Sequence, residues 1–239
     1  MGNGSRWVLI AASVALLGVG GWFGGRAAVE RIVHDYILEH PEILPQAMEN
    51  LQQRQAGEQL AAVRQTVETP FPGAVMGNPQ GSVTLVEFTD FACGYCRQSL
   101  PDVKQLIAGN PDLRIVIREL PIISPHSTDA ARWALAAAEQ GKYSPFHDAL
   151  FAAGQLDPQV IEAVAKEVGL DMERAAKVAS SPTVEQEIQR NLDLASRLGF
   201  SGTPSWIAGN RLIAGAVGLD QLSQAVAEAR DVKGPPAGS

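Results

Sequence analysis

Cys93 and Cys96 are the only two cysteines of the chain, and two other residues separate them. They follow the most strand-like run of the sequence, Val83 to Phe88. Beyond them, apolar residues recur at helical spacing as far as Ile107, so the sequence predicts a helix that begins at Cys93. Any fold for this chain therefore has to lead a buried strand directly into a helix at the cysteine pair.

A cysteine at the first turn of a helix is expected to be reactive. The first backbone N–H groups of a helix have no intrahelical partners, and the helix dipole places about half a positive charge there, which favours a thiolate over a thiol. The lowered pKa makes Cys93 the predicted nucleophile. Cys96 lies one turn later on the same helical face and within disulfide reach, so it can resolve a mixed disulfide formed on Cys93. The pair is predicted to act as a two-electron switch.

Three other roles for the pair are open. A zinc site needs about four ligands, and the histidines are scattered as His34, His40, His126 and His147, without a second close pair. A structural disulfide across so short a loop would remove little chain entropy and would stabilise the fold weakly. Two inert buried thiols are the third alternative, against which the predicted position at a helix start argues.

Composition sets only broad limits. A chain of 239 residues with 46% hydrophobic residues is long enough for one domain with extensions and a substantial core. Its formal net charge of -7 gives no support for nucleic-acid binding. We therefore expect no nucleic-acid partner.

Residues 1–27 form a separate N-terminal segment. An apolar run from Trp7 to Gly25 lies between Arg6 and Arg26, and as a helix it would reach close to the ~30 Å thickness of a bilayer hydrocarbon core. Aromatic residues near both ends and the lack of a clear small-residue cleavage site favour an uncleaved signal-anchor. A signal peptide cleaved after Ala27 is the alternative. Either one predicts export to a compartment where disulfides form.

Residues 28–68 change to a helix-forming composition. Apolar residues at helical spacing, interrupted at His40-Pro41, predict helices with an apolar stripe. Such a stripe needs a partner, which is either the catalytic domain of the same chain or other copies of the chain. Residues 69–81 then hold three prolines and three glycines. They predict an irregular linker that lets the catalytic domain move.

The run from Val83 to Arg97, VTLVEFTDFACGYCR, resembles the active-site strand, turn and helix of the DsbA-like branch of the thioredoxin superfamily. The later segment Gly-Thr-Pro-Ser-Trp at 202–206 resembles the cis-proline loop of the same family. The resemblance extends from about residue 77 to residue 229. It implies an α/β thioredoxin fold with a helical insertion over residues 82–230.

The resemblance also implies how a substrate binds. It predicts a cis bond before Pro204, with backbone groups of Thr203 free to pair with an extended substrate chain beside Cys93. A trans proline that only marks the start of a strand is the alternative. With Tyr95, between the cysteines, Thr203 and Pro204 are the candidate substrate-binding residues.

Glu87 is an outlier within the predicted strand. A strand buried on both faces reads as a continuous apolar run, so a carboxylate there is costly unless it has a task. In the DsbA-like pattern an acid at this position lies under the active site. The resemblance therefore assigns Glu87 to proton exchange with Cys96, with a pKa raised by burial. The alternative is an exposed glutamate on a short edge segment.

The remaining pattern predicts the other elements of that fold. A second strand is expected over 113–120, and a hairpin is expected at Gly209-Asn210. Helices are expected over 129–140, 145–153, 158–168 with Asp157 as cap, 183–198 and 219–230. The helical insert is expected over about 127–199, and a disordered tail over 231–239. His126 and His147 are assigned no chemistry, as a solvated turn residue and a packing or capping residue.

We therefore predict an exported thiol:disulfide oxidoreductase that acts on protein substrates without a metal or organic cofactor. Gly94-Tyr95 resembles the dipeptide of a periplasmic isomerase. The segment from Tyr36 to Leu44 resembles the N-terminal oligomerisation segment of the suppressor-of-copper-sensitivity protein C family, whose members include trimers. These resemblances favour a disulfide isomerase in a homo-oligomer, with a trimer preferred.

The predicted location is the periplasmic side of the inner membrane, tethered by residues 1–27, or the periplasm itself if that segment is cleaved. A membrane redox partner is expected to reset the cysteine pair. The alternatives are a monomeric disulfide oxidase or reductase and, in another class, a copper-binding or copper-tolerance protein whose two thiolates hold Cu(I).

Overall fold

The computed structural model describes residues 29–232. The chain divides into two compact units, Met1–Arg54 and Gln55–Ser239. The predicted membrane segment, residues 1–27, lies outside the described residues, as do residues 233–239 of the predicted tail. Among the helices of residues 29–232, none is long and apolar enough to cross a membrane.

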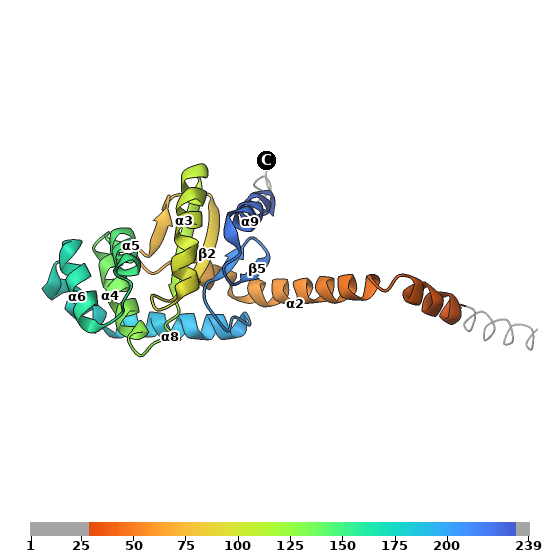
Figure 1. Cartoon of the computed structure of the whole chain (residues 1–239), viewed down its shortest axis with the longest axis horizontal. Helices are drawn as coiled ribbons and strands as arrows, with labels where there is room; N and C mark the ends of the chain where they lie inside the picture. Colours follow the sequence, from red (N-terminus) through yellow and green to blue (C-terminus); the bar gives the residue numbers. More distant parts are fainter. Residues whose placement is uncertain (1–28, 233–239) are drawn as a thin grey trace, which may run out of the picture. The chain divides into compact units, whose positions relative to one another are not determined.

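A five-stranded mixed sheet forms the centre of the second unit (Figure 1). Its strands are β1 (Val75–Gly77), β2 (Val83–Thr89), β3 (Leu113–Glu119), β4 (Ser205–Ala208) and β5 (Arg211–Ala214), in the order β1-β3-β2-β4-β5. β2 and β3 are parallel, and the other neighbours are antiparallel. All of β2 is buried, as expected for a central strand covered on both faces. This thioredoxin-like α/β arrangement confirms the predicted fold of the catalytic domain.

The cysteine pair lies on one face of this sheet. On that face Leu85 and Ile115 share a core with buried residues of α3 (Gly94–Gly109) and α9 (Gly218–Val232). Figure 1 shows α3 lying across the strands. The predicted tail begins too early, because α9 continues through residues 231 and 232. Since α3 starts directly after β2, the cysteine pair lies at the junction of these two elements on this face of the sheet.

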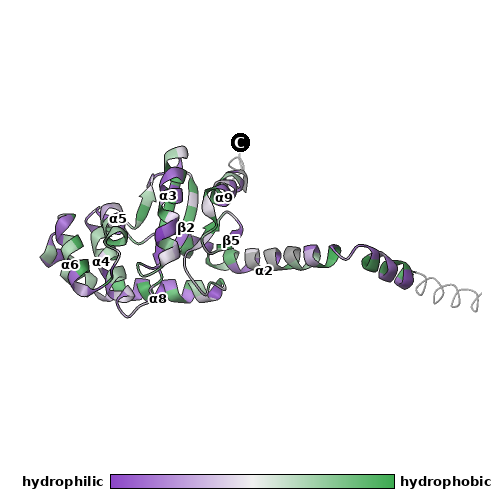
Figure 2. Ribbon diagram, viewed as in Figure 1, coloured by the Kyte–Doolittle hydropathy of each residue, from purple (hydrophilic) through white to green (hydrophobic). Residues whose placement is uncertain are grey.

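Five helices fill the chain between β3 and β4. They are α4 (Ser127–Glu139), α5 (Tyr143–Ala153), α6 (Pro158–Glu167), α7 (Met172–Ala179) and α8 (Pro182–Arg197). The apolar pattern predicts four of them, and the Asp157 side chain caps α6 as expected. It misses α7, a short helix capped by Asp171. In Figure 2 hydrophilic and hydrophobic bands alternate along these helices, as expected when one side of a helix is buried.

The helical N-terminal part is interrupted where the sequence predicts a break. Residues 29–39 are helical, and α2 (Ile43–Glu68) follows after His40-Pro41. In the last turns of α2, however, Leu60, Val63 and Val67 are buried in a core on the sheet face opposite α3. These turns therefore contact the sheet of the same chain, which is the first of the two partners that the sequence leaves open. An apolar stripe has the same spacing whether it covers its own domain or another chain.

Residues 69–81 are not irregular throughout, which corrects the predicted linker. β1 pairs with β3, and Phe71 and Met76 are buried in the core beside α3. Gly73 has a φ of 83° and lies so close to the backbone carbonyl of Ala138 that a Cβ atom would overlap it. The glycine here allows close packing, where the sequence pattern indicates flexibility.

A fully buried arginine joins the end of α2 to the sheet. The guanidinium of Arg118, in β3, donates to the backbone carbonyls of Thr66, Val67 and Thr69. It also donates to the carboxylate of Glu187, in α8, at 2.6 Å. α2 has no basic residue in its own last turn. Arg118 therefore supplies the positive charge that the carbonyl end of a helix favours.

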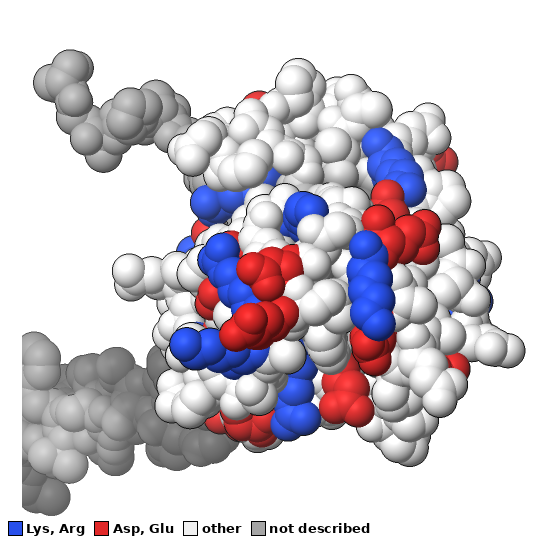
Figure 3. Space-filling model, turned by 90° about the vertical axis from the view of Figure 1, so that its left-hand side faces the viewer, with Lys and Arg blue, Asp and Glu red and all other residues white. Residues whose placement is uncertain are grey.

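Charged side chains of both signs share the surface of the molecule. On the face shown in Figure 3, basic and acidic side chains lie beside one another. Ion pairs such as Arg132–Glu185 and Lys166–Glu162 occur in the helical insert. This face therefore presents no extended patch of one sign to a charged partner.

Candidate active site

The cysteine pair lies where β2 leads into α3. Cys93 is the N-cap residue of α3 and Cys96 is in its first turn. Both thiols are free and buried. The Cys93 sulfur accepts a hydrogen bond from the Cys96 backbone N–H at 3.2 Å and donates one to the carbonyl oxygen of Thr203 at 3.1 Å. The structure thus brings together the two motifs on which the family resemblance depends.

The Cys93 thiol is strongly acidic. A hydrogen bond with the Cys96 side chain is the main cause that lowers the pKa of Cys93 to about 5. Burial opposes the shift, and hydrogen bonds with Thr203 and with the backbone of Cys96 and Tyr95 add to it. The direction agrees with the prediction. The main cause differs, because the neighbouring thiol contributes more than the N–H groups of the helix start.

The pKa of the Cys96 thiol is shifted in the opposite direction to that of Cys93. Burial is the first cause that raises the pKa of its thiol above the usual range, followed by the hydrogen bond with Cys93 and the charge of Glu87. The residue is fully buried in the core between α3 and the sheet. The pair therefore consists of one sulfur that ionises readily and one that holds its proton.

Glu87 lies in the middle of the central strand, opposite Ile117 of β3 and Trp206 of β4. It is 1% exposed, so the alternative of an exposed glutamate is wrong. Burial first, and then the Cys93 thiolate, raise the pKa of the Glu87 carboxyl to about 8. A group with this pKa can exchange a proton near neutral pH.

The 202–206 loop lies at the carboxyl end of β2. Its Thr203–Pro204 bond is cis, as the resemblance implies. β4 follows and pairs both with β2 and, through the two-residue turn Gly209-Asn210, with β5. The predicted hairpin is confirmed. Because β4 is hydrogen-bonded to β2, the loop that precedes β4 is held beside Cys93.

The sequence prediction misses Asp90, which follows β2 directly. Its buried carboxylate accepts hydrogen bonds from the backbone N–H groups of Ala92 at 2.8 Å, Ile122 at 2.8 Å and Ile123 at 2.9 Å. It also accepts one from the Ser127 hydroxyl at 2.7 Å. One carboxylate thus ties the turn before the cysteine pair to the loop after β3 and to α4. An aspartate after a strand is an ordinary turn signal, and its distant partners leave no mark in the local sequence.

Large apolar side chains are exposed at this end of the sheet. Tyr95, between the cysteines, is 66% exposed, and Ile122 and Ile123 are 45% and 51% exposed. Tyr95 is a predicted site residue, whereas the two isoleucines are not. Asp90 holds the backbone of the two isoleucines and the active-site turn together, so the three exposed side chains belong to segments that meet at the active site.

Glu119 is a second buried acid that the sequence prediction misses. It ends β3 and accepts a hydrogen bond from the Tyr143 hydroxyl at 2.7 Å. Burial is the largest cause that raises the pKa of Glu119 well above its usual value, and the charges of Asp90 and Glu87 add to it. A buried acid at a strand end could have been noticed, but its tyrosine partner lies on a distant helix.

The two histidines of the insert region fit the roles expected of them. His147 is buried and packs against the rings of Phe91 and Phe151, and burial lowers the pKa of its imidazole. His126 precedes α4 and makes no side-chain capping bond to it. Neither histidine is assigned a chemical step.

Residues 29–232 contain no group of three or more His, Cys, Asp and Glu side chains that could hold a metal ion. The hypothesis of a Cu(I) site made by the two cysteines alone stays a prediction. Titration of the reduced protein with Cu(I), against a Cys93→Ser/Cys96→Ser variant, is the measurement that checks it.

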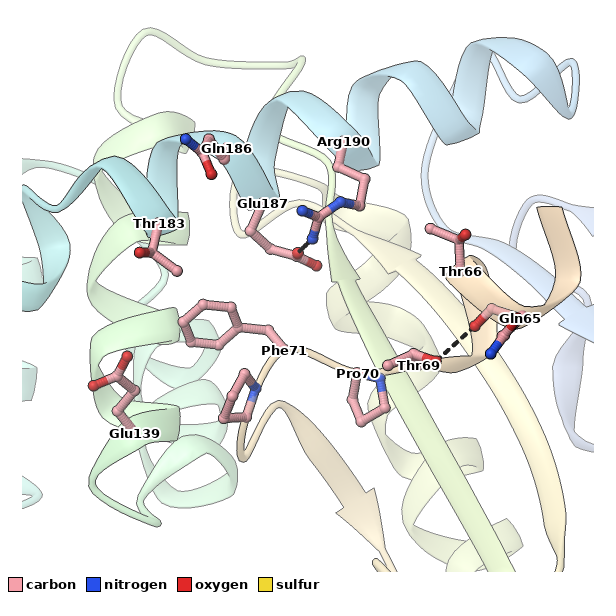
Figure 4. A pocket seen from close by; sticks show the side chains of 11 residues that line it. Gln65, Thr66, Thr69, Pro70, Phe71, Glu139, Thr183, Gln186, Glu187 and Arg190 are labelled. Atoms are coloured by element: carbon pink, nitrogen blue, oxygen red, sulfur yellow. Dashed lines mark hydrogen bonds and ion pairs between the residues drawn. The ribbon is translucent and has the colours of Figure 1, made fainter.

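A cavity of about 400 Å³ lies between the end of α2, α4 and α8 (Figure 4). In Figure 4 the ring of Phe71 points toward Thr183, and Arg190 faces Glu187, with which it forms an ion pair. None of the predicted site residues lines this cavity.

Two family models match different parts of the chain. The DSBA-like thioredoxin domain matches residues 84–227. The Copper resistance protein ScsC N-terminal domain matches residues 26–58. The first match covers β3, β4, β5 and nearly all of β2, both cysteines and the helical insert. The second covers the helix at residues 29–39 and the first part of α2.

Solved structures agree with the first match. A thioredoxin-like oxidoreductase from Silicibacter pomeroyi DSS-3 is 43% identical, with a TM-score of 0.63 over 66% of this chain and 91% of that chain. Proteus mirabilis ScsC in a transitional conformation is 27% identical, with a TM-score of 0.65 over 86% of this chain and 97% of that chain. The curated Na(+)/H(+) antiporter NhaA 3 of Salinispora tropica is 34% identical over 158 residues, which are 65% of this chain and 24% of that protein. The chain thus spans about a quarter of the length of the curated relatives that it matches. Because the thioredoxin-domain match covers more than half of the chain and coincides with the reactive thiol pair, the chain belongs to the DSBA-like thioredoxin family.

Proposed function

We propose that this protein is an exported disulfide isomerase that acts on protein substrates through Cys93 and Cys96. The contrast between the two thiols carries the proposal. Cys93 has a pKa of about 5, whereas the pKa of Cys96 is raised. At neutral pH the first is a thiolate and the second a thiol, as a nucleophile and a resolving thiol require.

The reaction begins when the Cys93 thiolate attacks one sulfur of a substrate disulfide. The substrate S–S bond breaks, a mixed disulfide forms on Cys93, and the other substrate sulfur leaves as a thiolate. That thiolate can attack another disulfide of the same substrate. A substrate thiolate finally displaces Cys93, so the disulfides are rearranged without net oxidation or reduction.

The second outcome of the mixed disulfide is its resolution by Cys96. Cys96 loses its proton and attacks the Cys93 sulfur. The Cys93–Cys96 bond then forms, and the substrate leaves with both of its sulfurs reduced. Glu87 is the group that accepts the proton. In the mixed disulfide Cys93 carries no charge, so its contribution to the raised pKa of Glu87 disappears and the carboxyl ionises more readily.

An extended or partly unfolded polypeptide is the substrate that this surface fits. The Thr203 carbonyl and the cis Pro204 lie beside Cys93, where backbone groups of a substrate can pair. The exposed side chains of Tyr95, Ile122 and Ile123 offer apolar contacts around the sulfur. Buried apolar residues that flank cysteines become accessible only in unfolded or misfolded chains, which supports a role in correcting disulfides.

Self-association supports isomerisation over oxidation. In residues 29–39, apolar side chains at helical spacing are half exposed or more: Val29, Ile32, Val33 and Tyr36. Such a stripe needs a partner, and residues 26–58 match the N-terminal domain of copper resistance protein ScsC. We take the partner to be other copies of the chain, in a trimer. Several active sites can then act on one substrate that holds more than one disulfide.

Export is supported by the apolar run at 7–25 and by the need of the reaction for an oxidising compartment. Residues 1–27 tether the protein to the periplasmic side of the inner membrane, or are removed to leave a periplasmic protein. A membrane redox partner returns the pair to its reduced form. Cell fractionation with N-terminal sequencing of the full chain checks the location, and recovery of the protein in the cytoplasm would contradict it.

Refolding of a protein with scrambled disulfides tests the isomerase. The reduced full-length protein is expected to restore the activity of the scrambled substrate, and Cys93→Ser is expected to abolish this effect. Cys96→Ser is expected to retain part of it, because it still forms the mixed disulfide. If instead the oxidised protein oxidises a reduced substrate well and the reduced protein does not reshuffle a scrambled one, the protein is an oxidase.

A further inference from the structure

Thr89, the last residue of β2, has no role in the mechanism described so far. The residue is fully buried, and its Oγ1 atom has no hydrogen-bond partner among the residues that the structure describes. A buried hydroxyl without a partner costs free energy, and such groups call for an explanation, of which a catalytic role is one. Here the explanation that we argue involves the thiol of Cys96.

The fold directs this hydroxyl toward Cys96. Side chains alternate along β2, so Thr89 faces the same side as Leu85, which is the side covered by α3. The carbonyl oxygen of Asp90 accepts a hydrogen bond from the Cys93 N–H at 2.9 Å, so the chain turns tightly from β2 into α3. The Asp90 backbone N–H and the Thr89 hydroxyl both act to lower the pKa of Cys96, although burial prevails. Thr89 thus faces the same core that contains Leu85 and Cys96.

We infer that the Thr89 hydroxyl and the Asp90 backbone N–H form a binding site for the Cys96 thiolate in the resolving step. The inference rests on the proposed function. In the resting protein Cys96 is a neutral thiol, and Thr89 makes no complete hydrogen bond to it. A charged sulfur is a better acceptor, so the donors close on it when it forms. Hydrogen bonds of catalytic groups are often long at rest and tighten only during reaction.

The resolving step needs no group other than those of this site and the substrate. In the mixed disulfide the Cys96 proton passes to the Glu87 carboxylate, and the thiolate accepts hydrogen bonds from Thr89 and Asp90. The thiolate attacks the Cys93 sulfur, the Cys93–Cys96 bond forms, and the substrate sulfur leaves as a thiolate. Thr89 is therefore a catalytic residue that sets how long the mixed disulfide survives. A long lifetime favours rearrangement of the substrate, and a short one favours its reduction.

Kinetics of the mixed disulfide test the inference in the full-length protein, with a disulfide-bonded peptide as probe. Thr89→Val keeps the shape and the β-branched side chain but removes the hydroxyl. We expect the mixed disulfide to form at the wild-type rate and to resolve about 10- to 100-fold more slowly, the usual effect of losing a hydrogen bond to a charged group. Thr89→Ser retains a hydroxyl and is expected to recover most of the resolution rate. Thr89→Ala replaces the valine variant if that variant does not fold.

Thr84→Val is the matched control. Thr84 lies on the same strand and is buried, but its hydroxyl accepts a hydrogen bond from Arg114 at 2.9 Å. Its loss is expected to leave both rates unchanged. Equal resolution rates in Thr89→Val and the wild type would overturn the inference, and so would equally slow Thr89→Val and Thr89→Ser variants, which would indicate packing. If the wild type formed no mixed disulfide at all, the proposed function would fail instead.

Discussion

Neighbouring residues give the two chemically identical thiols of this site different pKa values. Hydrogen bonds of the Cys93 sulfur with Cys96, with Thr203 and with the backbone of the helix start lower the pKa of the Cys93 thiol, and together they outweigh burial. Cys96 lies deeper, where burial first, and then the hydrogen bond with Cys93, raise the pKa of its thiol. Each thiol is the other's largest or second-largest influence, so the acidity of Cys93 is a property of the pair more than of the helix dipole.

Removing the second thiol tests this dependence. In a Cys96→Ala variant the pKa of Cys93 is expected to rise from about 5 toward the ordinary thiol value, because the largest stabilising hydrogen bond of the thiolate is lost. Ultraviolet absorbance of the thiolate during a pH titration measures this pKa. Ser99→Ala, a similar change at a buried position of the same helix, is the control and is expected to leave it unchanged. A Cys93 pKa that stays at about 5 in Cys96→Ala would mean that the backbone donors of the helix start suffice.

The raised pKa of Glu87 predicts that the stability of the fold decreases as the pH rises. The folded protein holds the Glu87 proton up to a pKa of about 8, against 4.5 for an unperturbed carboxyl. The unfolded chain releases this proton first, so wild-type stability falls as the pH rises through this window. The reduced Glu87→Gln variant has no titrating carboxyl at this position. Its free energy of unfolding relative to the wild type is therefore expected to increase between about pH 5 and about pH 8. The gain is a few kcal/mol at most, since one pKa unit corresponds to about 1.4 kcal/mol.

Denaturant unfolding of the reduced proteins at the two pH values measures this difference. Glu185→Gln is the control, because Glu185 is an exposed partner in a surface ion pair with Arg132, and it is expected to show no such gain. A difference in unfolding free energy between Glu87→Gln and the wild type that is the same at both pH values would refute the raised pKa.

Elements that depend on local interactions are the ones that local patterns predict. β2, α3, the β4–β5 hairpin and four helices of the insert follow from periodicity, caps and turn residues. β1 could not be predicted in this way, because it is three residues long and forms only through its pairing with β3. The last turns of α2 show an apolar stripe without showing what the stripe contacts.

The active-site residues also fall into two groups, those that local motifs predict and those that only the fold shows. Cys93, Cys96, Glu87 and Pro204 lie in motifs whose spacing is visible in the sequence. The structure places the two cysteines and Pro204 at the carboxyl end of β2 and Glu87 within that strand. The partners of Asp90 come from the loop after β3 and from α4. Long-range contacts of this kind leave no periodic mark, so the residues that hold the site in place are those that only the fold shows.

Gly73 tests whether the segment before β1 is packed or flexible. Gly73→Ala is expected to destabilise the protein by about 2 kcal/mol or more, because a side chain is strained at a φ of 83° and overlaps the Ala138 carbonyl. Gly109→Ala is the control. No atom lies within 4 Å of a Cβ at Gly109, at the end of α3, so its stability is expected to stay the same or to rise. Thermal or denaturant unfolding measures both, and similar results for the two variants would restore the flexible linker.

The whole molecule distributes its apolar surface unevenly between the two units. Among the described residues of the unit Gln55–Ser239, the exposed large apolar side chains are Tyr95, Ile122 and Ile123, which lie in the active-site turn and in the loop that Asp90 joins to it. In the unit Met1–Arg54 most large apolar side chains of the described residues are exposed: Val29, Ile32, Val33, Tyr36, Leu38, Leu44, Met48 and Leu51. Short helices without tertiary packing are marginal in water. The described residues of the first unit therefore expose more apolar surface than those of the second, and this surface is available for the self-association proposed above.

This difference predicts a variant in which assembly and thiol chemistry separate. Ile32→Gln/Tyr36→Gln places polar groups in the exposed stripe, at 67% and 52% exposed positions. It is expected to convert the proposed oligomer to monomers in sedimentation velocity. The Cys93 pKa is expected to stay at about 5, because its causes all lie in the second unit, whereas reactivation of a scrambled substrate is expected to fall several-fold. Arg31→Gln/Glu39→Gln changes exposed polar positions of the same helix and is expected to remain oligomeric and active. A monomeric double variant with wild-type reactivation would show that one active site suffices, which would leave the stripe without a role in isomerisation.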